Sequence, residues 1–166
     1  ALLFLGSGSV IHAMSGEQDM MKMGGLKSKI KITHITFLIG TFAISGMPLF
    51  SGMISKDEIL ISAWAKNPVS WVILFAIAAM TATYMFRLYY LTFHGTFRGT
   101  EEQKKHLHES PLNMTLPLIV LAILSVVGGF INLPHFVAHG EFETLHHWLQ
   151  PLYVFDTELP EVAFNT

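Results

Sequence analysis

Three adjacent ionisable residues, Lys56, Asp57 and Glu58, directly follow an apolar stretch whose helical pattern is interrupted. The interruption consists of residues that weaken or break a helix, namely Gly46, Pro48 and Gly52. Non-helical backbone and ionisable side chains occur at membrane depth only where protein or a hydrated cavity surrounds them. The pattern therefore predicts an ion or proton path here, built as transporters build mid-membrane ion sites from broken helices.

Proton transfer is the chemistry that this group offers. Burial lowers the pKa of a lysine and a neighbouring carboxylate raises it, so a lysine in such a site can change protonation state near neutral pH. Consecutive side chains on a helix point about 100° apart, so the three groups cannot all face one partner. We therefore expect Lys56 to be the proton-loading centre, with Asp57 and Glu58 tuning it or accepting its proton. The alternative is that all three charges face water beside a re-entrant loop.

Two histidines are further candidates for a proton relay. His34 lies near the start of the same apolar stretch and His12 near the end of an earlier one, although an interfacial position is the simpler interpretation of each. A C-terminal group has a His-x3-His spacing that zinc ligands on a helix can use; it consists of His135, His139, His146 and His147. Because Pro134 and Gly140 flank that spacing, we expect no metal site.

Composition indicates a membrane protein. The chain has 166 residues, of which 51% are hydrophobic and 13% charged, and its mean hydropathy is +0.47. The absence of cysteine excludes disulfides and thiolate metal sites, and no glycine-rich phosphate loop is present. The basic content is too low for a nucleic-acid-binding protein. The chain begins Ala-Leu-Leu without an initiator methionine or a basic leader, so we expect a fragment of a longer polytopic chain.

The predicted fold is all-α, a polytopic bundle of transmembrane helices of the antiporter-like type with one discontinuous helix. We expect the end of one span at residues 1–14, further spans at 71–93 and 111–131, and the broken span at 32–65. A straight helix over 32–65 would be about 50 Å long, which exceeds the hydrocarbon core of about 30 Å. A break near Gly46 and Pro48 resolves that excess length.

Charges in the connecting segments orient these spans. Residues 15–31 carry four lysines and residues 94–110 carry three basic residues, whereas residues 132–166 contain neither lysine nor arginine. Because basic loops remain on the cytoplasmic side, we expect 15–31 and 94–110 to be cytoplasmic and the tail 132–166 to be periplasmic. The expected location is a bacterial inner membrane, with multiple passes; the mitochondrial inner membrane is the less favoured alternative.

Several motifs, taken together, resemble a known family. They are FLGSGSVIH at 4–12, EQD at 17–19, KMGGL at 22–26, Gly46-x-Pro48, SKDEIL at 55–60 and YMFRLY at 84–89. This set is similar to the distal antiporter-like membrane subunits of respiratory complex I, the NADH-quinone oxidoreductase subunits called L or chain 5. The resemblance covers residues 1–94, with gaps; beyond them only the hydropathy pattern matches.

The resemblance implies a part of the enzyme NADH:quinone oxidoreductase that translocates protons and holds no redox centre. The lysine of the family's second broken helix corresponds to Lys56 and the adjacent carboxylate to Asp57. NADH, flavin, iron–sulfur clusters and quinone are expected in other subunits, and the partners implied are the other membrane subunits and the lipid bilayer. The same motifs resemble the large subunits of Mrp-type sodium/proton antiporters and membrane-bound hydrogenases. A structural membrane scaffold, with water-facing charges, is the alternative of a different class.

Overall fold

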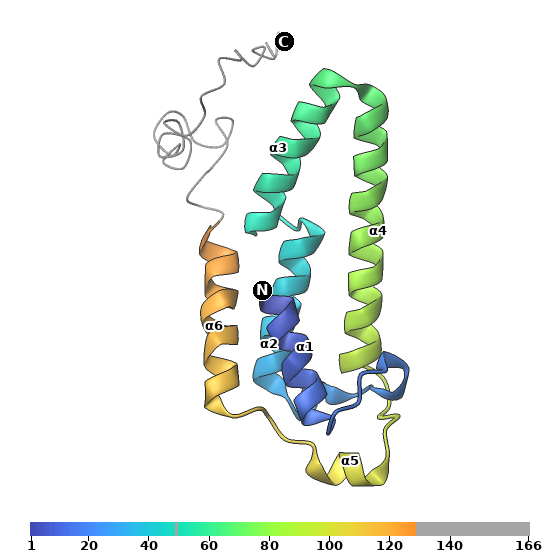
Figure 1. Ribbon diagram of the computed structural model, residues 1–166, viewed down its shortest axis with the longest axis vertical. Helices are drawn as coiled ribbons and strands as arrows, with labels where there is room; N and C mark the ends of the chain where they lie inside the picture. Colours follow the sequence, from blue (N-terminus) through green and yellow to red (C-terminus); the bar gives the residue numbers. More distant parts are fainter. Residues whose placement is uncertain (49, 129–166) are drawn as a thin grey trace.

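The computed structural model describes residues 1–48 and 50–128, and within them the chain is helical without strands (Figure 1). The α-helices are α1 (Leu2–Ala13), α2 (Lys31–Ser45), α3 (Ser51–Lys66), α4 (Pro68–Phe93), α5 (Glu101–His106) and α6 (Leu112–Val127), and two 3-10 turns are η1 (Met20–Lys22) and η2 (Leu26–Ser28). Helix α2 is central, because it contacts α1, α3, α4 and α6. The all-helical fold class is confirmed. The predicted tail at 132–166, with its histidines, lies outside the described residues.

Helix α4 is the longest element, and its first turn has clear local causes. The Asn67 side chain accepts a hydrogen bond from the Val69 backbone N–H at 2.9 Å, and Pro68 occupies the first helical position, where its missing N–H costs nothing. The helix therefore begins at Pro68, before the position predicted for this span. With 26 residues it is, among the described helices, the one long and apolar enough to cross a membrane by itself; α1, α2 and α6 are shorter apolar helices.

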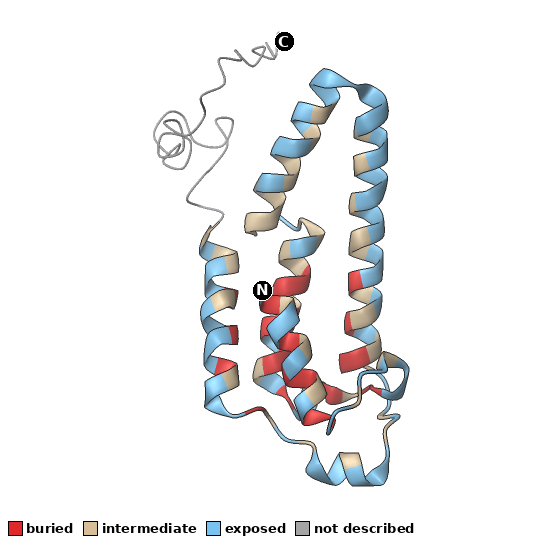
Figure 2. Cartoon of the chain, viewed as in Figure 1, coloured by how far each residue is buried: buried red, intermediate tan, exposed pale blue. Residues whose placement is uncertain are grey.

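The buried core lies in one half of the bundle (Figure 2). It consists of residues from α1, the loop after it, α2 and the C-terminal half of α4, including Val10, Met14, Leu26, Phe37 and Phe93. Helix α3 and the N-terminal half of α4 instead expose large apolar side chains such as Trp64, Ile73 and Phe75. Exposed apolar surface of this extent requires lipid or further helices to cover it.

The two basic loops, 15–31 and 94–110, lie at the same end of the bundle, and the α3–α4 turn lies at the opposite end (Figure 1). Arg98 joins the two loops, since its Nε donates to the Met23 carbonyl and its guanidinium NH2 to the Leu91 carbonyl, both at 2.6 Å. A Cβ on Gly24 would lie 2.4 Å from the Thr96 carbonyl oxygen, so only glycine permits this approach. Within the second loop, Thr100 forms a capping box that starts α5.

Helix α2 receives its N-terminal cap from a residue distant in sequence. The Glu109 carboxylate accepts hydrogen bonds from the Ile32 backbone N–H at 2.8 Å and from the Thr33 hydroxyl at 2.7 Å. Buried hydroxyls continue this network, with Ser9 2.7 Å from Thr33 and 2.6 Å from Ser110. A negative charge at this end of α2 is favourable because it opposes the positive pole of the helix dipole. The network fixes α1, the start of α2 and the segment before α6 relative to one another.

Candidate functional site

The connection between α2 and α3 has a defined backbone geometry. Gly46 adopts a left-handed conformation with φ of 78°, its N–H donates to the Ala43 carbonyl at 3.3 Å, and the Met47 N–H donates to the Phe42 carbonyl at 3.1 Å. This pair of hydrogen bonds is the Schellman arrangement that ends a helix. It satisfies two of the last carbonyls of α2 but leaves that of Ile44 without a backbone donor in this motif.

Lys56 provides the donor for that remaining carbonyl. Its Nζ donates a hydrogen bond to the Ile44 carbonyl oxygen, and the side chain is half-buried. The ammonium therefore lies at the C-terminal end of α2, where the helix dipole places partial negative charge. A Cβ on Gly46 would lie only 3.2 Å from Lys56 Cδ, so the glycine also leaves space for the lysine stem.

Gly52 has a different role from the one expected. It lies inside the first turn of α3, not in the non-helical segment, because α3 begins at Ser51. A Cβ at this position would lie 1.8 Å from the Ala43 carbonyl oxygen, so the start of α3 packs directly on the last turn of α2. Gly52 and Lys56 are four residues apart and share one face of α3. The close approach of Gly52 to Ala43 therefore brings Lys56 to Ile44.

The neighbouring carboxylates are not brought to the lysine. Asp57 is half-buried and Glu58 is exposed. In the described part of the chain, neither of them forms a salt bridge with Lys56. Pro48 is exposed in the connection between the two helices.

Ser45 is a polar residue at the break that the sequence analysis did not assign to the site. Its hydroxyl oxygen is buried and has no hydrogen-bond partner among residues 1–48 and 50–128. Buried hydroxyls in proteins are nearly always paired with protein or water, so this one calls for a partner outside the described residues, such as water. Its position directly before the helix-ending glycine is the sequence signal that could have identified it.

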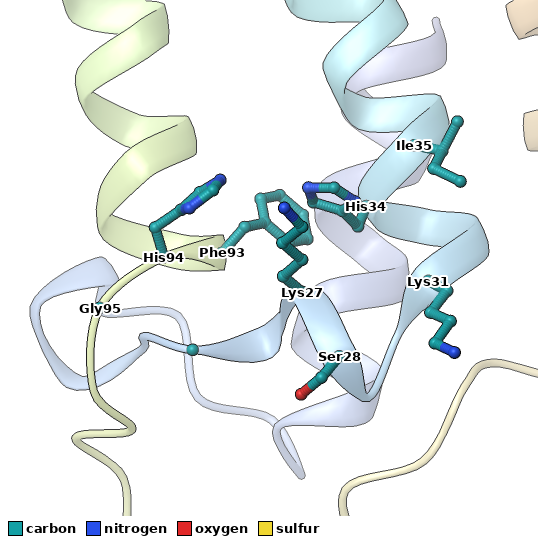
Figure 3. A pocket seen from close by; sticks show the side chains of 9 residues that line it. Lys27, Ser28, Lys31, His34, Ile35, Phe93, His94 and Gly95 are labelled. Carbon is teal, nitrogen blue, oxygen red and sulfur yellow. The ribbon is translucent and has the colours of Figure 1, made fainter.

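A second polar group lies at the basic end of the bundle. His34 Nε2 is 2.6 Å from the Tyr89 hydroxyl, and His94 Nε2 is 3.4 Å from the same hydroxyl. His34 and Tyr89 are both buried and their rings stack. An open pocket of about 640 Å³ reaches this group, with Lys27, His34 and His94 among its lining residues (Figure 3). Tyr89 thus lies between two histidines, and its contact with His34 depends on the packing of α2 against α4.

His12 does not join that group. It is exposed on the last turn of α1, and its ring lies 6.2 Å from that of His108 in an edge-to-face arrangement. His34 and the Lys56 contact at Ile44 are both on α2, about 15 Å apart along the helix axis. Phe37 is buried on the stretch between them, and the Thr41 hydroxyl there donates to the Phe37 carbonyl.

Comparison with known proteins identifies the family. A sequence model described as NADH:quinone oxidoreductase/Mrp antiporter, transmembrane, matches residues 1–85, which is just over half of the chain. The chain belongs to this family. The segment matched contains α1, α2, α3 and most of α4, and therefore the whole of the Lys56 site.

Individual members of the NADH:quinone oxidoreductase/Mrp antiporter family agree with this assignment. The chain is 49% identical to NAD(P)H-quinone oxidoreductase chain 5 of Picosynechococcus sp. over 81% of its length and 24% of that protein. It is 44% identical to NADH-quinone oxidoreductase subunit L of Rhodobacter capsulatus over 85% of its length and 23% of the relative. The similarity to the chloroplastic subunit 5 of Zygnema circumcarinatum, at 40% identity, covers 99% of the chain and 29% of the relative. The chain thus spans about a quarter of the length of these relatives.

Proposed function

We propose that this chain is the part of an antiporter-like subunit of complex I that carries one step of proton translocation, with Lys56 as the group that gains and loses the proton. The observation that carries the proposal is the lysine ammonium held at the carbonyl end of α2 by the Ile44 oxygen. The matched relatives are named as subunits of NAD(P)H-quinone oxidoreductases, which favours complex I over an Mrp-type antiporter.

In this proposal α2 and α3 form one discontinuous transmembrane helix. Helix α4, which is long enough to cross a membrane, contacts both α2 and α3. The two consecutive half-helices, of 15 and 16 residues, both pack against this 26-residue helix and have an irregular segment between them. Such segments are tolerated at membrane depth where they line a cavity and serve an ion site.

The proton step involves few groups. Lys56 releases one proton from Nζ and becomes a neutral amine, and Asp57, Glu58 or water in the break accepts that proton. In the neutral state the amine can still donate to the Ile44 carbonyl, so the contact survives deprotonation while its electrostatic attraction to the helix dipole is lost. Ser45 and the irregular backbone supply further polar partners. His34, Tyr89 and His94 form a relay at the basic end, from which protons reach the break through intervening water.

The remaining parts of the proposal rest on the charges of the loops and on the family resemblance. The basic loops face the cytoplasm of a bacterial cell and the chain crosses its inner membrane several times. NADH, flavin, iron–sulfur clusters and quinone are held by other subunits, and other membrane subunits of the complex are the partners.

The test is proton uptake into vesicles driven by NADH oxidation, with quinone reduction followed in parallel, in the intact parent complex and its Lys56→Ala form. Lys66→Ala is the matched control, because Lys66 is an exposed lysine on the same helix, away from the break. We expect assembly to persist in both forms, with proton uptake or turnover falling sharply only in Lys56→Ala. Unchanged uptake in Lys56→Ala would refute the assignment. Uptake that depends on sodium and proceeds without NADH oxidation would favour the Mrp-type alternative.

A further inference from the structure

The pocket that reaches His34 and His94 is also lined by lysines to which the proton path gives no role. The pocket of about 640 Å³ lies among η2, the start of α2 and the end of α4, and Lys27, Ser28 and Lys31 contribute to its lining. Figure 3 shows Lys27 extending toward His34 and His94, whereas Lys31 and Ile35 point to the outer side of α2. Lys27 and Lys31 are both exposed.

Within residues 1–48 and 50–128, no acidic side chain lines this pocket to neutralise its positive charge. The salt bridges of the described residues involve Lys22 and Lys104, not Lys27 or Lys31. Glu109, beside the first turn of α2, uses its carboxylate oxygens to accept from Ile32 and Thr33. The pocket therefore attracts an anion through its lysine side chains.

An apolar groove of about 460 Å³ adjoins the pocket. It runs between α2 and α6, and its lining is aliphatic apart from Thr36; the other residues are Ile32, Ile35, Ile39, Ile119, Ala122, Ile123, Val126 and Val127. Ile35 belongs to the linings of both cavities and is 54% exposed. Residues 32, 35 and 39 place the groove along about 10 Å of α2, leading away from the basic end.

We propose that the pocket and the groove together bind one anionic phospholipid, with its phosphate against Lys27 and Lys31 and an acyl chain in the groove. The pocket and the groove share Ile35 as a lining residue and have the two chemistries that such a molecule combines. Basic pockets between transmembrane helices bind anionic lipid head groups, and an exposed aliphatic groove requires an apolar occupant. The proposal rests on the membrane location of the chain and not on proton movement at Lys56.

The test uses phosphatidylglycerol with a photoactivatable group on its acyl chain, added to the purified intact complex, with mass spectrometric mapping of labelled peptides. We compare the wild-type protein with the double variant Lys27→Gln, Lys31→Gln. Lys29→Gln is the matched control, because Lys29 is an exposed lysine of the same loop that lines neither cavity. Ile35→Ala tests the groove, and its exposed side chain contributes little to folding.

We expect labelling of the segments 32–39 and 119–127 in the wild type. Each lysine near an anionic head group contributes roughly five-fold in affinity, so the double variant should need roughly 25-fold more lipid for equal labelling, while Lys29→Gln behaves as the wild type. Photoactivatable phosphatidylcholine should label these segments weakly. Equal labelling of the double variant and the wild type would overturn the proposal. Absence of labelling in both segments would also overturn it, because it would mean that the rest of the parent chain fills the groove. Competition by millimolar inorganic phosphate, with equal labelling by the two lipids, would assign the pocket to a free anion instead.

Discussion

Replacing Gly52 by alanine tests the geometry of the break most directly. The added methyl would lie 1.8 Å from the Ala43 carbonyl oxygen and 2.8 Å from its carbonyl carbon, whereas Cβ atoms do not approach other atoms more closely than 3.0 Å. The backbone of α3 must therefore move away from α2 by at least about 1.2 Å, which is the difference between the lower limit of 3.0 Å and the 1.8 Å separation from the Ala43 oxygen. The obstacle is backbone, so no side-chain rotation can relieve it.

This displacement should separate Lys56 from its acceptor. Lys56 lies one helical turn from Gly52 on the same face of α3, so it moves with it. Its hydrogen bond to Ile44 involves a charged donor, a class of bond that contributes about 1.5–3 kcal/mol. Overpacking at a tight contact costs about a further 1–3 kcal/mol. A loss of this size at one contact should leave the remaining helices folded and abolish the defined position of the lysine.

Proton uptake driven by NADH oxidation is the assay, with native electrophoresis to establish assembly. We expect the Gly52→Ala complex to assemble and to pump at well below the wild-type rate. Gly8→Ala is the control, since a Cβ there has no atom within 4 Å and alanine stabilises a helix relative to glycine. If Gly52→Ala pumps as the wild type does, the close contact between α2 and α3 is not needed for function and the argument fails.

Three further changes have definite expected outcomes. Glu109→Ala removes the cap of α2 and should lower the free energy of unfolding by about 1–2 kcal/mol in thermal or denaturant unfolding, whereas the exposed Glu102→Ala should have little effect; equal effects of the two changes would contradict the cap. The backbone N–H of Asp19, and then the Lys22 side chain, hold the pKa of Glu17 below its usual 4.5. Its contribution to the order of the loop is therefore complete above that value and is lost as the pH falls through the lowered pKa. The protection factor of the Asp19 amide, which is the intrinsic exchange rate at a given pH divided by the measured one, should fall over that range in the wild type, and a pH-independent protection factor would contradict this. Tyr89→Phe removes the hydroxyl between the two histidines and should slow proton uptake less than Lys56→Ala does; a rate equal to the wild type would exclude this relay.

Sequence reasoning was most successful where the cause of a feature is local. Gly46 tolerates the left-handed backbone that ends α2, and the end of that helix falls where the Gly-x-Pro pattern predicts it. The membrane class follows from composition and the family from motif strings, and the family match confirms both. Whether α2 and α3 cross the membrane as one discontinuous helix stays a prediction.

Features that depend on contacts between residues distant in the sequence could not be predicted from the sequence. Gly52 was expected in the unwound segment, but its role is set by the Ala43 carbonyl on another helix. The pairing of His34 with Tyr89 requires that α2 and α4 pack with those positions in register. Glu109 gave no signal as a helix cap because it lies 76 residues after Thr33, which is in the first turn of the helix it caps.

The sequence by itself therefore determined the class of protein and the residue at which α2 ends, because backbone conformation and hydropathy are properties of short segments. The role of Lys56 in proton transfer stays a prediction. The tertiary structure decided what the lysine contacts. The approach of α3 to α2 at Gly52 brings Lys56 to the Ile44 carbonyl and leaves Asp57 and Glu58 without a salt bridge to it. That outcome depends on how two helices pack, which no single segment specifies.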